Sequence, residues 1–373
     1  MPDPRLEQLA RVLVNYSTEV KPRDHVAVVA SPLATPLVRE IVRQVLRAGA
    51  YPYPLMGYDT YIGYFGFDDV FLAEANDDQL QHVSRIESML RGEFEAMIVL
   101  RSRENTRSLA GVENERRAIR NRAHLPLQDL FRQRSARGEL RWCFSLFPTA
   151  ALAQDAEMSL EDYERFVYAG MYADEPDAAA RWRQQRDEQA RLIEWLRGRK
   201  QVVMRGPNAD LRLSIDGRTF INSCGLFNMP DGEIYTGPVE DSVEGTVRFT
   251  YPAVADGVEV DGIELTFERG RVVRATAAKN EAYLLSGLDT DAGSRYLGEW
   301  AIGNNARINR FTKDILFDEK IAGSFHLALG AGYPETGSKN HSAIHWDLIC
   351  DMRQGGQILV DGDLFYDSGK FTV

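Results

Sequence analysis

The hydrophobic pattern of this chain changes its period near residue 200, and that change limits the folds that the chain can adopt. Before it, short apolar runs alternate with segments whose apolar residues recur at helical spacing, such as residues 37–46. Runs of this kind are typical of buried strands. Strands that alternate with helices predict a doubly wound, mostly parallel sheet. The predicted strands are residues 25–30 (HVAVVA), 50–56 (AYPYPLM), 96–100 (AMIVL) and 142–147 (WCFSLF).

After residue 200 the chain has short alternating runs, including residues 202–204 and 211–215, separated by Asp-Gly turn signals. This pattern predicts a strand-rich α+β domain with one helix near residues 280–288. A length of 373 residues also favours two domains over one core. We therefore predict an α/β scaffold domain over residues 1–199 and a strand-rich, metal-binding catalytic domain over residues 200–373.

Composition and charge exclude several kinds of partner. The net charge of −11 argues against binding to nucleic acid or to an anionic membrane surface. No window is apolar enough to span a membrane, and the N-terminus lacks the apolar core of a signal peptide. Cys143, Cys224 and Cys350 are too few and too far apart for a disulfide framework. We therefore expect a cytoplasmic protein.

Residues 317–347 hold the densest group of side chains able to do chemistry. Three of the six histidines, His326, His341 and His345, lie in this segment. On an extended strand, His345 and Asp347 would point to the same face, because strand side chains alternate. An imidazole and a carboxylate on one face can bind a divalent metal ion.

Three carboxylates beside glycine or turn residues extend this set of candidate metal ligands. A phosphate-binding role is unsupported, because no phosphate-binding glycine motif follows any predicted strand. Mixed carboxylates and histidines suit Zn²⁺, Co²⁺ or Mn²⁺. Six ligands are enough for two closely spaced ions, which could lower the pKa of a shared water and polarise a carbonyl. The candidate ligands are Glu233, Glu299, Glu319, His326, His345 and Asp347.

Several long motifs in the second half resemble the M29 family of metallo-aminopeptidases, the group of thermophilic aminopeptidase T. They are NMPDGEIYTGPVEDSVEG, LGEWAIG, LFDEK, HLALGAGY and KNHSAIHWD, with a weaker match in FPTAALAQDAEMSLEDYERF. The resemblance implies that the six candidates bind two divalent metal ions (Zn, Co or Mn). It also implies that Tyr333 is catalytic, with a phenol that hydrogen-bonds the tetrahedral intermediate. The six residues between Glu319 and His326 depart from the shorter spacing that we associate with the family.

The resemblance implies a metal-dependent aminopeptidase that removes N-terminal residues from short peptides by means of a water activated by two metals. It also implies a homodimer. Which carboxylate bridges the metals, and which group acts as the general base, stay open. His341 has no counterpart in the family motifs, and we expect it on the surface or outside the ligand set. Trp346, between two predicted ligands, is expected to point to the opposite face and to join the core.

Two other functions stay open at this point. A 2,5-dihydroxypyridine-type dioxygenase, which cleaves aromatic rings with Fe(II), resembles the same fold and needs only His326, His345 and Asp347. The three glutamates argue against it, because a single iron has no use for them. The third hypothesis is a non-catalytic protein that descends from such an enzyme and keeps the fold as a binding module.

Overall fold

The computed structural model describes residues 3–57, 67–255 and 257–373. The chain divides into two compact units, Met1–Trp182 with Gly225–Pro230, and Arg183–Cys224 with Asp231–Val373. The first passage between them falls inside helix α9 (Ala178–Leu196). The division into domains at residues 199 and 200 stays a prediction.

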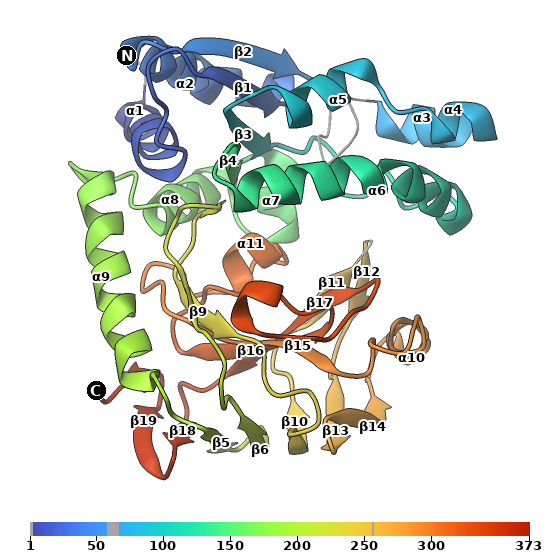
Figure 1. Ribbon diagram of the computed structural model, residues 1–373, viewed down its shortest axis with the longest axis vertical. Coiled ribbons are helices and arrows are strands. Elements are labelled where there is room, and N and C mark those ends of the chain that lie inside the picture. The colour runs from blue at the N-terminus through green and yellow to red at the C-terminus, as the bar shows by residue number, and fades with distance from the viewer. Residues whose placement is uncertain (1–2, 58–66, 256) are drawn as a thin grey trace. The chain divides into compact units, whose positions relative to one another are not determined.

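The first unit contains a parallel sheet, as the alternation of strands and helices predicts. Its strand order is β2-β1-β3-β4-β8, and every neighbouring pair is parallel. Figure 1 labels the first four of these strands. All residues of β1 after His25 are buried, as expected for a parallel strand covered on both faces. The strands are β1 (His25–Ala30), β2 (Tyr51–Met56), β3 (Ala96–Arg101), β4 (Arg141–Leu146) and β8 (Asn228–Met229).

Helices connect these strands. The apolar positions of α2 fall on one side, and Leu37, Val38, Ile41 and Val45 are buried. Ser159 caps the N-terminus of α8 (Leu160–Gly170), because its Oγ accepts a hydrogen bond from the Asp162 backbone amide at 3.1 Å. The helices of this part of the chain are α1 (Pro4–Arg11), the π-helix η1 (Val12–Ser17), the 3₁₀ helix η2 (Pro32–Ala34), α2 (Thr35–Arg47), α3 (Asp68–Glu74), α4 (Asp77–Gln81), α5 (Arg85–Gly92), α6 (Asn114–Ala136), α7 (Ala150–Asp155) and α8 (Leu160–Gly170).

The second unit is strand-rich. One sheet has the order β14-β13-β10-β6-β5-β18-β19-β20, another has the order β17-β16-β15-β9-β7, and β11 pairs with β12. Figure 1 labels all of these strands except β7 and β20. Its strands are β5 (Gln201–Gly206), β6 (Ala209–Ser214), β7 (Ile221–Ser223), β9 (Glu233–Thr236), β10 (Glu244–Arg248), β11 (Ala253–Ala255), β12 (Val258–Val260), β13 (Glu264–Glu268), β14 (Arg271–Thr276), β15 (Leu297–Gly303), β16 (Ser324–Gly330), β17 (His345–Asp351), β18 (Gln357–Val360), β19 (Asp363–Asp367) and β20 (Lys370–Phe371). Its helices beyond α9 are α10 (Glu281–Leu288), α11 (Ile315–Asp318) and the 3₁₀ helix η3 (Pro334–Thr336). The parallel sheet and the strand-rich unit together confirm the predicted fold class.

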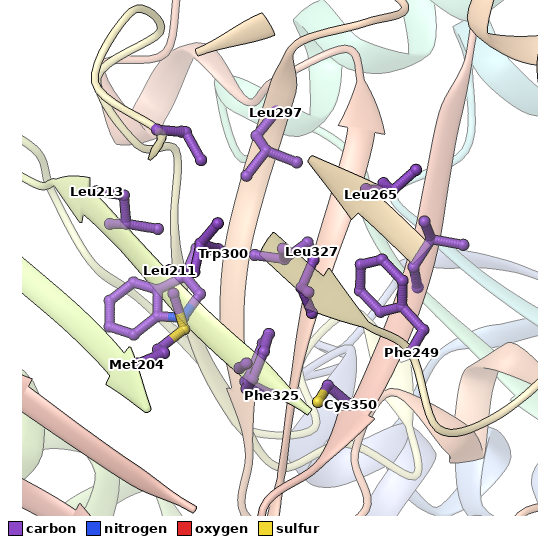
Figure 2. Packing of buried hydrophobic residues seen from close by; sticks show 14 of the residues in the cluster. Met204, Leu211, Leu213, Phe249, Leu265, Leu297, Trp300, Phe325, Leu327 and Cys350 are labelled. Carbon is purple, nitrogen blue, oxygen red and sulfur yellow. The ribbon is translucent and has the colours of Figure 1, made fainter. Parts of the chain in front are cut away.

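The two larger sheets of the second unit share one hydrophobic core. Figure 2 shows Trp300 of β15 and Leu327 of β16 among side chains of β5 and β6, such as Met204 and Leu211. All four are fully or almost fully buried. Removing this much apolar surface from water is the main force that holds the sheets together. One face of the β9–β15–β16–β17 sheet is therefore fixed in place by packing.

The cysteines and the helices add two further observations. Cys143, Cys224 and Cys350 are buried and form no disulfide bond. Among the helices that the structure describes, none combines the length and the apolar character needed to cross a membrane. The expected cytoplasmic location stays a prediction.

Candidate metal centre

Five of the six candidate ligands lie on one face of the β9–β15–β16–β17 sheet. Each of them alternates along its strand with a residue of the shared core, because successive strand residues point to opposite faces. Trp346, between two of the candidates, is in that core, as predicted. The core neighbours are Ile234, Trp300, Phe325, Leu327, Trp346 and Leu348, and the candidates are Glu233, Glu299, His326, His345 and Asp347.

The strand register brings these side chains together. Ala328 of β16 lies opposite Glu299 on one side and Asp347 on the other. Ala301 of β15 lies opposite His326. Both alanines are fully buried, and their small side chains leave room between the longer ones, which reach one another across neighbouring strands.

The histidines and carboxylates are within ligand range of one another. His326 Nε2 lies 3.5 Å from Glu233 Oε2 and 3.5 Å from Glu299 Oε1. His345 Nε2 lies 3.3 Å from Glu299 Oε2 and 3.5 Å from Asp347 Oδ1. Glu299 therefore faces both histidines, with one oxygen toward each.

Glu319 joins the group from outside the sheet. It ends helix α11, whose N-cap Asp314 accepts a hydrogen bond from the Leu316 amide at 3.2 Å. The short helix directs Glu319 toward His326 and Asp347, with which it forms a group of possible ligand atoms within 4.8 Å of one another. The structure thus brings Glu319 to the other five despite its longer spacing from His326.

Three overlapping groups of ligand atoms result. They are Glu233–Glu299–His326, Glu299–His345–Asp347 and Glu319–His326–Asp347. Glu233 Oε2 and Asp347 Oδ1 are buried and lack a hydrogen-bond donor among the described residues. Buried acceptors without a partner are costly, and a bound cation would satisfy them. The residues present therefore fit a divalent metal centre.

The electrostatics of the cluster follow from burial and from mutual proximity. Burial raises the pKa of Glu233, although Lys320 opposes the change. Burial would lower the pKa of His326, but the Glu299 and Glu233 carboxylates raise it to about 9. The same competition raises the pKa of His345, chiefly through Asp347. Protons therefore compete with a metal ion for these imidazoles. Binding of a metal ion should release protons from the two histidines.

Tyr333 lies at the edge of this cluster. It follows β16 and precedes η3, and its ring centroid is 5.2 Å from that of His345 and 5.4 Å from that of Tyr235. Desolvation, together with the Glu299 and Asp347 carboxylates, raises the pKa of Tyr333 well above its ordinary value. The phenol therefore stays protonated and can donate a hydrogen bond. His341 is exposed and belongs to none of the three ligand groups.

Two residues near the ligands were not among the predictions. Lys320 is fully buried and forms ion pairs with Glu233 and Glu319. Gln189 of α9 donates from Nε2 to the backbone carbonyl oxygens of Glu233 and Ser223, at 2.9 and 2.8 Å. The LFDEK motif contains Lys320, but a lysine that directly follows two acidic residues usually lies in a solvent-exposed turn. The motif therefore did not predict that Lys320 is buried. Gln189 lies in a charge-rich helix, and nothing in its local sequence indicates burial.

Comparison with known proteins identifies the family of this chain. The chain matches the sequence profile of the thermophilic metalloproteases (M29) over residues 2–371. This match covers nearly the whole chain. The chain therefore belongs to the M29 family of metalloproteases.

Its relatives include proteins named as aminopeptidases. Aminopeptidase 2 of Geobacillus stearothermophilus is 32% identical over 71% of this chain and 68% of its own length. Aminopeptidase T of Thermus thermophilus is 29% identical over 62% of this chain, an alignment that spans only 60% of that relative.

Two solved structures share the fold. AmpT from Thermus thermophilus superposes with a TM-score of 0.85 at 23% identity and covers 99% of both chains. The 2,5-dihydroxypyridine dioxygenase from Pseudomonas putida has a TM-score of 0.58 at 16% identity, covering 99% of this chain and 97% of that one. At such identities the likeness concerns the fold alone.

Proposed function

We propose that this protein is a metal-dependent aminopeptidase that removes N-terminal residues from short peptides. The observation that supports it most strongly is the set of three overlapping ligand groups on one sheet face, joined by Glu319. Membership of a metalloprotease family and relatives named as aminopeptidases support the same activity.

The proposed cofactors are two divalent ions, Zn²⁺, Co²⁺ or Mn²⁺, held by Glu233, Glu299, Glu319, His326, His345 and Asp347. Ions bound there would polarise the scissile carbonyl and lower the pKa of a water molecule. Glu299 would take part in holding the ions, since its two carboxylate oxygens face different histidines at 3.5 and 3.3 Å.

The remaining chemistry is assigned to residues of the chain. The Tyr333 hydroxyl donates a hydrogen bond to the carbonyl oxygen, which becomes negative when the carbonyl is attacked. This hydrogen bond stabilises a charge that develops only in the transition state. The buried floor of the site, made by Ala301 and Ala328, excludes water from the far side of the ligands. A carboxylate of the cluster holds the proton taken from water until it passes to the leaving amine.

Short peptides are the proposed partners, and a homodimer and a cytoplasmic location are proposed with them. Three buried cysteines without a disulfide bond are compatible with a reducing compartment. The acidic net charge argues against nucleic acid as a partner.

Metal removal and replacement tests the proposal. The purified protein is stripped with a chelator and assayed on leucyl-7-amido-4-methylcoumarin as Zn²⁺, Co²⁺ or Mn²⁺ is added back. Activity should disappear with the metal, return with at least one ion, and be absent in His345→Ala. His341→Ala is the matched control, since it removes an exposed histidine outside the ligand groups and should keep activity.

An inactive protein would point to the second candidate function. A single Fe(II) would need His326, His345 and Asp347. Asp347 Oδ1 lies 4.0 Å from His326 Nε2 and 3.5 Å from His345 Nε2, but none of the three ligand groups contains both histidines. Glu233 and Glu299 face the same space and favour the hydrolase. If no added metal gives hydrolysis with any of a panel of N-terminal residues, the aminopeptidase proposal is wrong. Fe(II), oxygen and dihydroxylated aromatic compounds are then the next assay.

A further inference from the structure

Lys320 is a buried cation placed against the proposed ligands. Its side chain is 1% exposed, and Nζ contacts Glu233 Oε1, Glu319 Oε1 at 2.6 Å and Asp231 Oδ1 at 3.6 Å. A lysine is rarely buried this completely unless carboxylates compensate its charge. Lys320 therefore belongs to the same electrostatic unit as the metal centre.

The backbone around Lys320 fixes where its side chain can reach. The Lys320 amide donates to the carbonyl of Phe317 at 3.0 Å, and its own carbonyl accepts from the Asn305 amide at 3.1 Å. Asn305 Nδ2 in turn donates to the carbonyl of Asp231 at 2.8 Å. Lys320 thus connects the end of α11 to the segment that leads into β9, where Glu233 lies.

The contacts divide the oxygens of each glutamate between two tasks. Glu233 Oε1 contacts Lys320, whereas Oε2 is buried, lacks a donor among the described residues and lies 3.5 Å from His326 Nε2. Glu319 also gives Oε1 to Lys320. One oxygen of each carboxylate is therefore occupied by the ammonium group, and the other is left for a metal ion.

We propose that Lys320 is a positioning residue that makes Glu233 and Glu319 single-oxygen ligands of the metal centre. This inference rests on the proposed function, because it concerns how that centre binds its ions. A carboxylate that gives only one oxygen takes one coordination position instead of two, and so leaves positions open for water and substrate.

The charges of the buried groups agree with this role. The carboxylates of Glu233, Glu299, Glu319 and Asp347 match the charge of two divalent ions. Asp231, which is 1% exposed, matches Lys320. A buried charge without compensation is costly, so Lys320 and Asp231 can orient the ligands without changing the charge offered to the metal ions.

The test compares Co²⁺ binding to metal-free wild type, Lys320→Met and the control Lys279→Met. Lys279 pairs with Glu259 at 2.8 Å outside the ligand groups. The number of bound ions, the chelator-competition affinity and the visible absorption per Co²⁺ are measured. In Lys320→Met the freed oxygens should also bind the metal. The higher coordination number should lower the absorption per ion by about twofold or more. The kcat should fall about 10- to 100-fold, because the added oxygens take positions that water and substrate need, and the control should match wild type.

The outcomes separate this inference from the proposed function. Wild type that binds no Co²⁺ would show that the metal centre itself is wrong. Wild type that binds Co²⁺, with a Lys320→Met spectrum and kcat unchanged, would overturn only the role of Lys320. Lys320→Gln, which keeps an amide NH₂ donor group without the charge, replaces Lys320→Met if that variant does not fold, and should change the spectrum in the same direction. Failure of both variants to fold would assign Lys320 a structural role and reject the inference.

Discussion

The β9–β15–β16–β17 sheet has two faces that differ in almost every chemical respect, although the same strands form both. One face holds Trp300, Phe325 and Leu327 and is fully buried against the rest of the core. The other face holds Glu299, His326 and Asp347, separated by alanines. Strand alternation alone produces the difference.

The comparison shows how the fold tolerates so many buried charges. The core face supplies the apolar burial that stabilises the sheet. The site face can then hold carboxylates that are unfavourable without a metal ion, because the strands that position them are fixed from behind. Function and stability should accordingly respond to different residues of the same strand.

The largest expected effect is on the site face. Glu299→Gln should lower aminopeptidase activity by more than about 10³-fold, beyond the usual cost of losing one transition-state hydrogen bond, because Glu299 faces both histidines. Steady-state assays with saturating metal measure it. Its neighbour Trp300→Phe, on the core face, should stay active. Equal losses in both variants would break the separation of the faces.

The second effect is on the core face. Leu327→Ala should reduce the free energy of unfolding by about 2–5 kcal/mol, because it leaves a cavity in a fully buried site. Guanidinium titration of the metal-free protein measures this, and Leu327→Met should cost less than about 1.5 kcal/mol. Metal stoichiometry should be unchanged in folded Leu327→Ala. Loss of metal binding would mean that the two faces are not independent.

The third effect concerns a residue outside the sheet. Tyr333→Phe keeps the ring beside His345 and removes only the phenolic hydroxyl. We expect kcat to fall by about 10²-fold, with little change in KM or in bound metal. An equally active Tyr333→Phe would exclude the hydroxyl from transition-state stabilisation. Tyr235→Phe is the control on the neighbouring ring.

The smallest effect lies on the site face at the far end of β17. Burial opposes ionisation of Asp351, but hydrogen bonds from Arg353 lower the pKa of this carboxyl below its usual value. Its contribution to stability is therefore present above the unfolded-state pKa, near about 3.9, and is lost as the pH falls through the folded-state pKa. Urea titrations of metal-free protein from neutral pH to about pH 3 should show a smaller pH dependence in Asp351→Asn. An identical pH dependence in wild type and Asp351→Asn would show that ionisation of Asp351 does not contribute to stability.

The sequence predicted the helices and strands better than it predicted which strands lie side by side. The strand–helix alternation of the first unit and the helix at α10 follow from local periodicity, and both are present. Strand β8 was not predicted, because two residues have no measurable period. Its segment, Gly225–Pro230, returns to the first unit between two passages of the second.

The candidate ligands show the same division. The sequence supplied the residue types and, for His345 and Asp347, the shared face of one strand. It did not determine that β9, β15, β16 and β17 would be adjacent, since this order depends on contacts between distant segments. Their roles as ligands remain a prediction that the metal experiments test.

The sequence by itself determined the period of each segment, and therefore which side chains share a face with which neighbours on the same strand. Only the tertiary structure decided the register that sets Glu299 opposite Ala328 and Asp347, and the burial of Lys320 beside Glu319. The physical reason is that alternation is a property of a single strand. Register and burial arise instead from packing among residues far apart in the chain.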